Sequence, residues 1–251
     1  MSVRFQVLGS GSAFPSAACG HASHLLHTDE GVWLVDAGPG ALQRCAQAGV
    51  AARDLAGVVI SHQHPDHTGE LGPLLFALRL APTRATALPL IGGEGLGVFL
   101  THLEQVWGRW VRPPGGVLLS ELSLQQGSEL RLGALTLRAR PATHSGAALL
   151  LRFEVQGRAL VYTGDTGPCP ALAELCRGAD LLVSECGRRA DDPHLAHLCA
   201  EDVAAVVRAS GVPEVWLTHL GPGVEPHAAQ AVVAAAGARV HIAADGDVWA
   251  N

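Results

Sequence analysis

The sequence of 251 residues contains no lysine, and all 17 of its basic residues are arginine. The chain therefore cannot form a Schiff base through a lysine amine, and it cannot build the phosphate-binding loop that depends on lysine. Positive charge is also scarce, because 17 basic against 23 acidic residues give 17 − 23 = −6. A general nucleic-acid binder is expected to carry a basic surface, so this class is not favoured.

Export and membrane signals are missing as well. The first 12 residues show no charged segment followed by an apolar one, and no apolar run reaches the roughly 18 residues that a membrane span needs. The six cysteines form no Cys-x-x-Cys pair, so we interpret them as reduced thiols. These absences predict a cytoplasmic protein without membrane association.

Apolar residues are plentiful, at 48% of the chain against 16% charged residues, which is enough for a large core. Strand and helix patterns alternate along the whole length. Residues 57–60 and 159–162 are typical of strands, residues 129–138 of one longer strand, and residues 94–107 of a helix. We expect a single α/β domain over residues 1–251, with layered sheets and outer helices.

Histidine is the residue type in excess, with 13 copies. It is the commonest metal ligand and a frequent acid or base near neutral pH. The segment SHQHPDH at residues 61–67 places three histidines and one aspartate directly after an apolar strand pattern. In an extended stretch His62 and His64 point the same way and can bind one ion, whereas Asp66 and His67 follow the proline bend and can face a second. Imidazole with carboxylate suits zinc, and also manganese or iron.

Four side chains cannot complete two metal sites, so further ligands are expected at the ends of other strands. Three residues fit, because each follows an apolar strand pattern, as ligands that converge on one rim would: His144, Asp165 and His219.

The order H-x-H-x-D-H, a separate histidine, a Gly-Asp pair and a Thr-His pair resembles the metallo-β-lactamase superfamily over nearly the whole chain. The resemblance implies a four-layer αββα sandwich that holds two divalent metal ions. It implies two ligand sets that share Asp165: His62, His64 and His144 for one ion, and Asp66, His67 and His219 for the other. Two such ions would turn a bridging water into hydroxide near neutral pH, and Asp66 would also orient it as a catalytic residue.

Two further stretches are similar to the ribonuclease Z-like branch of that superfamily. They are the D-x-G-x-G stretch at residues 36–40 and the segment around His197. In that branch His197 would protonate the leaving oxygen, and the Glu185 carboxylate would keep it protonated and aimed. Members that hydrolyse β-lactams usually carry cysteine where this chain has Asp165, so antibiotic hydrolysis is not expected.

Two departures argue against a whole transfer RNA as substrate. Ribonuclease Z carries a long arm that clamps tRNA, whereas His144 and Asp165 are only 165 − 144 = 21 residues apart, enough for a hairpin. Phosphate contacts are also few in a chain of net charge −6. We therefore expect a phosphodiesterase that acts on small, cyclic or nucleotide-derived diesters. The alternatives are arm-less tRNA 3′-processing, a thioester or lactone hydrolase of the same fold, and a redox or non-enzymatic member that holds di-iron.

Some segments keep two interpretations. The Trp/Arg/Pro segment at residues 109–116 could form a mobile lid or a contact of the homodimer that we expect. The Arg188-Arg189 pair could meet a phosphate or stay solvated. A second histidine group has a period of three and is not interpreted as a metal site: His21, His24 and His27.

Overall fold

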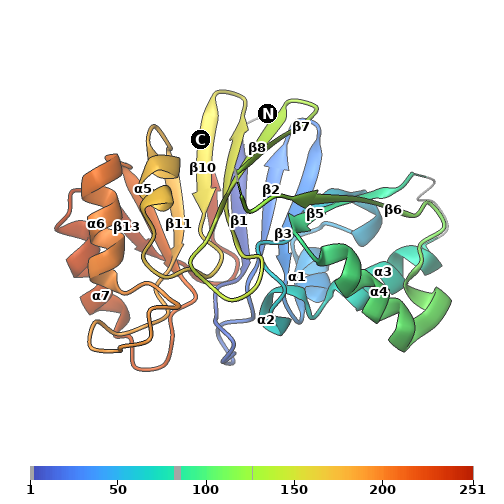
Figure 1. The fold of residues 1–251 in the computed structure, drawn as a ribbon, viewed down its shortest axis with the longest axis horizontal. Helices are drawn as coiled ribbons and strands as arrows, with labels where there is room; N and C mark the ends of the chain where they lie inside the picture. The colour runs from blue at the N-terminus through green and yellow to red at the C-terminus, as the bar shows by residue number, and fades with distance from the viewer. Residues whose placement is uncertain (1–2, 82–85, 126, 251) are drawn as a thin grey trace.

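The computed structural model describes residues 3–81, 86–125 and 127–250. Two β-sheets lie face to face in the middle of the molecule, and helices cover both outer sides (Figure 1). The strand order is β14-β1-β2-β3-β4-β5-β6 in the first sheet and β13-β12-β11-β10-β9-β8-β7 in the second. The expected αββα sandwich is confirmed.

The elements of each half follow one another along the chain, except that the last strand returns to the first sheet. The first sheet contains β1 (Arg4–Gly9), β2 (Ser23–Thr28), β3 (Gly31–Ala37), β4 (Leu55–Val59), β5 (Leu88–Gly93), β6 (Val117–Leu122) and β14 (Val248–Ala250). The helices of this half are α1 (Ala41–Gln47), η1 (Ala52–Asp54), α2 (Pro65–Thr68), α3 (Leu71–Leu80), α4 (Leu96–Trp107) and η2 (Gly108–Val111).

The second sheet contains β7 (Ser128–Leu132), β8 (Leu135–Pro141), β9 (Leu149–Val155), β10 (Arg158–Tyr162), β11 (Leu181–Glu185), β12 (Glu214–Thr218) and β13 (Arg239–Ile242). Its helices are α5 (Pro170–Cys176), α6 (Ala200–Ser210) and α7 (Pro226–Ala234), which lie together on the outer side of this sheet in Figure 1.

The four layers follow from strands that are apolar on both faces. Successive side chains of a strand point to opposite sides, so one strand can serve two cores. On β3, Trp33 and Val35 enter the core between the sheets, while Leu34 packs toward the helices of its own half. On β10, Tyr162 faces the same central core and Val161 faces the helices of the other half.

The directions of the strands bring the loops of the site to one edge. In the first sheet β3, β4, β5 and β6 are parallel, and in the second β10, β11, β12 and β13 are parallel. The loops after β4, β8, β10 and β12 therefore meet at the edge where α2 lies, the lower edge in Figure 1. Both chain ends lie at the opposite edge.

The secondary structure differs from the sequence-based prediction in several elements. The expected helix at residues 94–107 is confirmed as α4, but the single strand expected at residues 129–138 is wrong. The chain turns at Gly133, whose φ is 63°, and β7 and β8 form an antiparallel hairpin there. Helix α3 and strand β5 were not expected.

Within the described part of the chain, no helix combines the length and the apolar character needed to cross a membrane. All six cysteines are free.

Candidate metal centre

The first donor cluster lies where the loops after β4, β8 and β10 meet. It consists of His62, His64, His144 and Asp165, whose ligand atoms all lie within 4.8 Å of one another. His144 Nε2 is 3.3 Å from His64 Nδ1, and Asp165 Oδ2 is 3.7 Å from His62 Nε2. Side chains from both sheets therefore point at one small volume.

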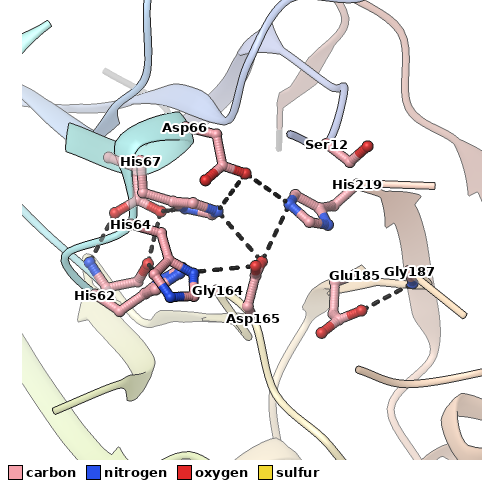
Figure 2. Close-up of polar contacts among 12 residues, drawn as sticks. Ser12, His62, His64, Asp66, His67, Gly164, Asp165, Glu185, Gly187 and His219 are labelled. Carbon is pink, nitrogen blue, oxygen red and sulfur yellow. Dashed lines mark hydrogen bonds and ion pairs between the residues drawn. The ribbon is translucent and has the colours of Figure 1, made fainter. Parts of the chain in front are cut away.

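The second cluster shares Asp165 and adds Asp66, His67 and His219. Asp165 Oδ1 is 3.3 Å from His67 Nε2 and 3.3 Å from His219 Nε2, and Figure 2 shows Asp165 between these groups. Asp66 Oδ2 lies 3.3 Å from His219 Nε2. One oxygen of Asp165 thus faces each cluster.

The geometry of both clusters fits a divalent cation. Ligands about 2.0–2.1 Å from a tetrahedral ion lie about 3.3 Å from one another, and the separations of Asp165 from the histidines of the two clusters range from 3.3 to 3.9 Å. Buried polar atoms are nearly always hydrogen-bonded. Among the described residues, however, His62 Nε2, His67 Nε2 and Asp165 Oδ1 have no hydrogen-bond partner of ordinary geometry. Atoms that could donate electron pairs to a cation are therefore buried and directed at one another.

The local sequence explains how one short loop serves both clusters. His64 has an extended backbone and precedes α2, and Pro65 occupies the first turn, where a missing N–H costs nothing. The helix carries Asp66 and His67 past this bend, toward the second cluster. The Thr68 hydroxyl donates to the His64 carbonyl at 2.8 Å and closes the turn.

His67 is oriented by Asp36, a residue to which the sequence analysis gave no role of its own. His67 Nδ1 donates to Asp36 Oδ2 at 2.7 Å, so its Nε2 faces the cluster. Asp36 also accepts hydrogen bonds from the Ser61 backbone and hydroxyl, each at 2.7 Å, and from the Tyr162 hydroxyl at 2.8 Å. Its φ of 56° is unusual for a residue other than glycine. Its position at the head of the D-x-G-x-G stretch was the available signal.

Neighbouring charges and burial shift the pKa values of His62 and His67 in opposite directions. Burial lowers the pKa of His67, but the carboxylates of Asp165 and Asp36 outweigh it and hold that pKa well above its usual value. Burial lowers the pKa of His62 to about 3, with a further contribution from His67. Burial opposes ionisation of Asp66, but the hydrogen bond from His219 and the charge of His67 bring its pKa to about 2. His62 is therefore neutral and able to ligate at any pH near neutrality.

His219 is held by Ser10, a residue near the other end of the sequence. Its φ is 53°, and its backbone N–H donates to the Ser10 carbonyl at 2.8 Å. Asp245 Oδ1 accepts from both the backbone and the hydroxyl of Ser10 at 2.8 Å. Sequence reasoning missed Asp245, because nothing in the residues around it points to a site.

His197 and Glu185 form a pair beside the second cluster. His197 Nδ1 donates to Glu185 Oε1 at 3.0 Å, and the Glu185 side chain is fully buried while that of His197 is 31% exposed. Glu185 also accepts from the backbone N–H groups of Thr166 at 2.7 Å and Gly187 at 2.8 Å. The hydrogen bond to Glu185 raises the pKa of His197, and burial raises the pKa of Glu185.

Arg188 meets neither of its two expected environments. It is buried, and it donates to the His197 carbonyl at 2.8 Å and to the Asp202 carboxylate at 2.6 Å. It therefore holds the loop that carries His197, and it is not a phosphate contact.

A cavity of about 130 Å³ opens onto the two clusters. Its lining includes Asp66, Asp165 and His219, together with the exposed residues Phe14 and Pro222. Trp110 and Val111, from the segment expected as a lid or dimer contact, line a different cavity. His24 is buried between Phe5 and Tyr162, and burial lowers its pKa to about 4.

Comparisons with known proteins identify the family. Residues 33–220 match the β-lactamase superfamily domain. The chain belongs to this superfamily. Together with the two donor clusters, membership makes the protein a metal-dependent hydrolase of the metallo-β-lactamase fold.

Individual members of the superfamily cover nearly the whole chain. A ribonuclease Z from Mycobacterium marinum is 30% identical over an alignment of 246 residues, and the match covers 88% of this chain and 88% of that protein. The metallo-β-lactamase fold protein YhfI from Bacillus subtilis superimposes with a TM-score of 0.86 at 24% identity, over 100% of this chain and 99% of that one. The short form of human tRNase Z gives 0.80 at 19% identity, over 98% of both chains. Both solved structures therefore share the fold of this chain.

Proposed function

We propose that this hydrolase is a dinuclear phosphodiesterase that acts on small, cyclic or nucleotide-derived phosphodiesters. The observation that carries the proposal is the position of Asp165, which offers one oxygen to each of two donor clusters. The proposed ligand sets are His62, His64 and His144 for one ion, Asp66, His67 and His219 for the other, and Asp165 for both. Imidazole with carboxylate favours zinc, with manganese or iron as alternatives.

A bound metal pair supplies a water of lowered pKa and offsets negative charge on the phosphoryl oxygens. The protein residues supply position. Asp66 lines the cavity and accepts a hydrogen bond from the attacking water. The buried Asp36 fixes His67, so the carboxylate and imidazole donors keep their places while the substrate binds.

His197 is the proposed general acid. It lines the cavity, and its Nδ1 is occupied by Glu185, so the other ring nitrogen is the one available to a substrate. Glu185 keeps the imidazole protonated and aimed, and His197 then gives its proton to the leaving oxygen. Arg188 supports this arrangement by donating a hydrogen bond to the His197 carbonyl.

The short connection between two of the proposed ligands favours a small substrate. β9 and β10 form a simple antiparallel hairpin between His144 and Asp165, a stretch that the structure describes in full. It has no room for a tRNA-clamping arm. The net charge of −6 further weakens binding to a long polyanion.

A second candidate function is 3′-processing of transfer RNA without the arm. It is favoured by the name ribonuclease Z of the mycobacterial relative, which this chain matches along 88% of its length. The two candidates share their ligands and their acid, and they differ in the substrate that fits outside the cavity.

We also propose a homodimer as the assembly. Phe76, Trp107 and Trp110 are 41–47% exposed and surround an apolar cavity of about 390 Å³ away from the clusters. An exposed aromatic surface of this kind is typical of protein interfaces. Residues 109–116, which include Trp110, would then form part of the dimer contact.

The test compares substrates and matched histidine variants on one preparation loaded with zinc, manganese or iron. The substrates are bis(p-nitrophenyl) phosphate, a cyclic nucleotide, a precursor tRNA and a thioester. We expect turnover of the small diesters and a loss of about 100-fold or more in His64→Ala on both of them. In His197→Ala we expect a loss of about 100-fold or more on the cyclic nucleotide, whose leaving alkoxide needs a proton. His102→Ala, on the exposed face of α4, is the control that should keep full activity.

Full activity in a folded His64→Ala variant would falsify the proposed ligand role. Cleavage of the precursor tRNA alone would replace the first candidate by the second, and turnover of the thioester alone would remove both.

A further inference from the structure

The cavity above the clusters is too small for a whole substrate. Its volume of about 130 Å³ lies well below the roughly 300–1,000 Å³ of pockets that enclose drug-sized ligands. It can take the phosphodiester group, but the ester substituents must lie outside, against its rim. The residues of that rim therefore decide which substituents are favoured.

The rim contains one large aromatic side chain. Phe14 lines the cavity and is nevertheless 70% exposed, so most of its ring faces solvent. Ala13 and Pro222 are the other exposed residues of the lining, and none of the described residues that line this cavity is an arginine. The most exposed positions of the cavity lining are therefore apolar.

The loop that carries Phe14 is anchored at its base. Gly20 N–H donates to Asp245 Oδ2 at 2.8 Å, and Gly11 N–H donates to the Gly20 carbonyl at 2.7 Å. Ser12 is buried next to His219, as Figure 2 shows, and its hydroxyl accepts the Phe14 N–H at 3.3 Å. Phe14 is thus attached at a fixed place beside the clusters, while its ring stays accessible.

We propose that Phe14 is a specificity-determining residue that stacks on the aromatic ring, such as a nucleobase, of the ester substituent that does not leave. This inference rests on the proposed phosphodiesterase function. Stacking on an aromatic side chain accepts any base, because every base has a π-face. The protein would then prefer diesters whose retained substituent carries a ring over diesters whose retained substituent is alkyl, without reading a base sequence.

The test uses two substrates with the same leaving group, thymidine 5′-(p-nitrophenyl phosphate) and methyl p-nitrophenyl phosphate. For Phe14→Ala we expect KM for the thymidine ester to rise about 5- to 30-fold, equivalent to about 1–2 kcal/mol, and KM for the methyl ester to stay unchanged. Phe14→Trp should retain the preference. Phe14→Leu, which keeps apolar bulk without a ring, should lose most of it.

Leu118→Ala removes another exposed apolar side chain, on β6, and serves as the matched control. An equal change for both substrates, or no change for either, would overturn the role of Phe14.

Calorimetric titration with thymidine 5′-monophosphate and with methyl phosphate separates recognition from turnover. We expect the wild type to bind the nucleotide more tightly and Phe14→Ala to bind both alike. If this difference is present but neither diester is hydrolysed, the proposed reaction fails and the recognition stands. If the wild type binds both ligands alike, the proposed role of Phe14 fails whatever the turnover.

Discussion

At the scale of single residues, the Asp36 carboxylate decides which nitrogen of His67 faces the cluster. Three donors reach Asp36 Oδ2, namely His67 Nδ1, the Ser61 hydroxyl and the Tyr162 hydroxyl, all within 2.8 Å. Because Nδ1 donates to Asp36, Nε2 is the nitrogen that would bind a cation, in place of the proton that the raised pKa of His67 favours there. Carboxylates in this position tune both the orientation and the basicity of a histidine ligand.

Replacing Asp36 by asparagine should weaken metal binding. Asp36→Asn keeps the size of the side chain but loses one of the two acceptor oxygens and the negative charge beside His67. We expect metal affinity to fall about 10- to 100-fold, measured by competition with a chromophoric chelator. Tyr162→Phe removes only one donor to Asp36 and should have a smaller effect. Asp54→Asn, at an exposed position on η1, is the control; unchanged affinity in Asp36→Asn would show that His67 needs no such partner.

At the scale of elements, β4 positions the loop that contributes four of the proposed ligands. Gly57 lies in the middle of this strand against the neighbouring strands. A Cβ built there would be 2.3 Å from Trp33 Cζ3 and 2.9 Å from the Pro89 carbonyl oxygen. The strand can therefore carry only glycine at this point without displacing the ring of a residue in the central core.

Gly57→Ala should destabilise the fold. Overpacking of this kind costs about 1–3 kcal/mol, which for a domain of this size lowers Tm by roughly 2–12 °C. Thermal unfolding followed by circular dichroism measures the change. Trp33→Leu removes the clashing ring, so the double variant should be more stable than the sum of the two single changes predicts. If the changes in unfolding free energy were strictly additive, a clash with Trp33 would not be the cause of the destabilisation by Gly57→Ala.

The elements that the sequence did not reveal have identifiable physical reasons. Helix α3 buries Leu71, Leu74, Leu75 and Leu78 at helical spacing, but Pro73 in its first turn breaks the pattern although it is tolerated there. The β7–β8 hairpin turns at Gly133 in a left-handed conformation, with the Ala134 N–H donating to Glu30 at 2.7 Å. Glu30 lies 104 positions away in the sequence, so the residues around the turn do not reveal this hydrogen bond.

At the scale of the whole molecule, the proposed ligands were predictable because strand ends are visible in a sequence. The dense motif of residues 61–67 and the apolar strands before His144, Asp165 and His219 pointed to one edge. The anchoring residues were not predictable. Asp245 acts on Ser10 across 235 positions and Asp36 on His67 across 31, and only the folded chain brings them together.

Since each donor cluster takes residues from both sheets, metal should stabilise the whole fold. A metal present at 100 times its Kd contributes about 2.7 kcal/mol, which corresponds to roughly 5–11 °C in Tm. We expect the chelator-treated protein to melt lower than the zinc-loaded protein by this amount. His64→Ala should reduce the shift and His102→Ala should keep it. Equal melting temperatures with and without metal would mean that the clusters contribute nothing to folding.

The division of the donors between the two halves of the chain also has a consequence for biosynthesis. His62, His64, Asp66 and His67 leave the ribosome first, while Asp165 and His219 are still to be made. After His67 is made, the first cluster lacks Asp165 for a further 165 − 67 = 98 residues and the second lacks His219 for 219 − 67 = 152 residues. Strand β1 likewise waits for its neighbour β14, which is made after both donor sets. Loading of both sites is thus a late event, and a product that ends before Asp165 is left without either complete donor set.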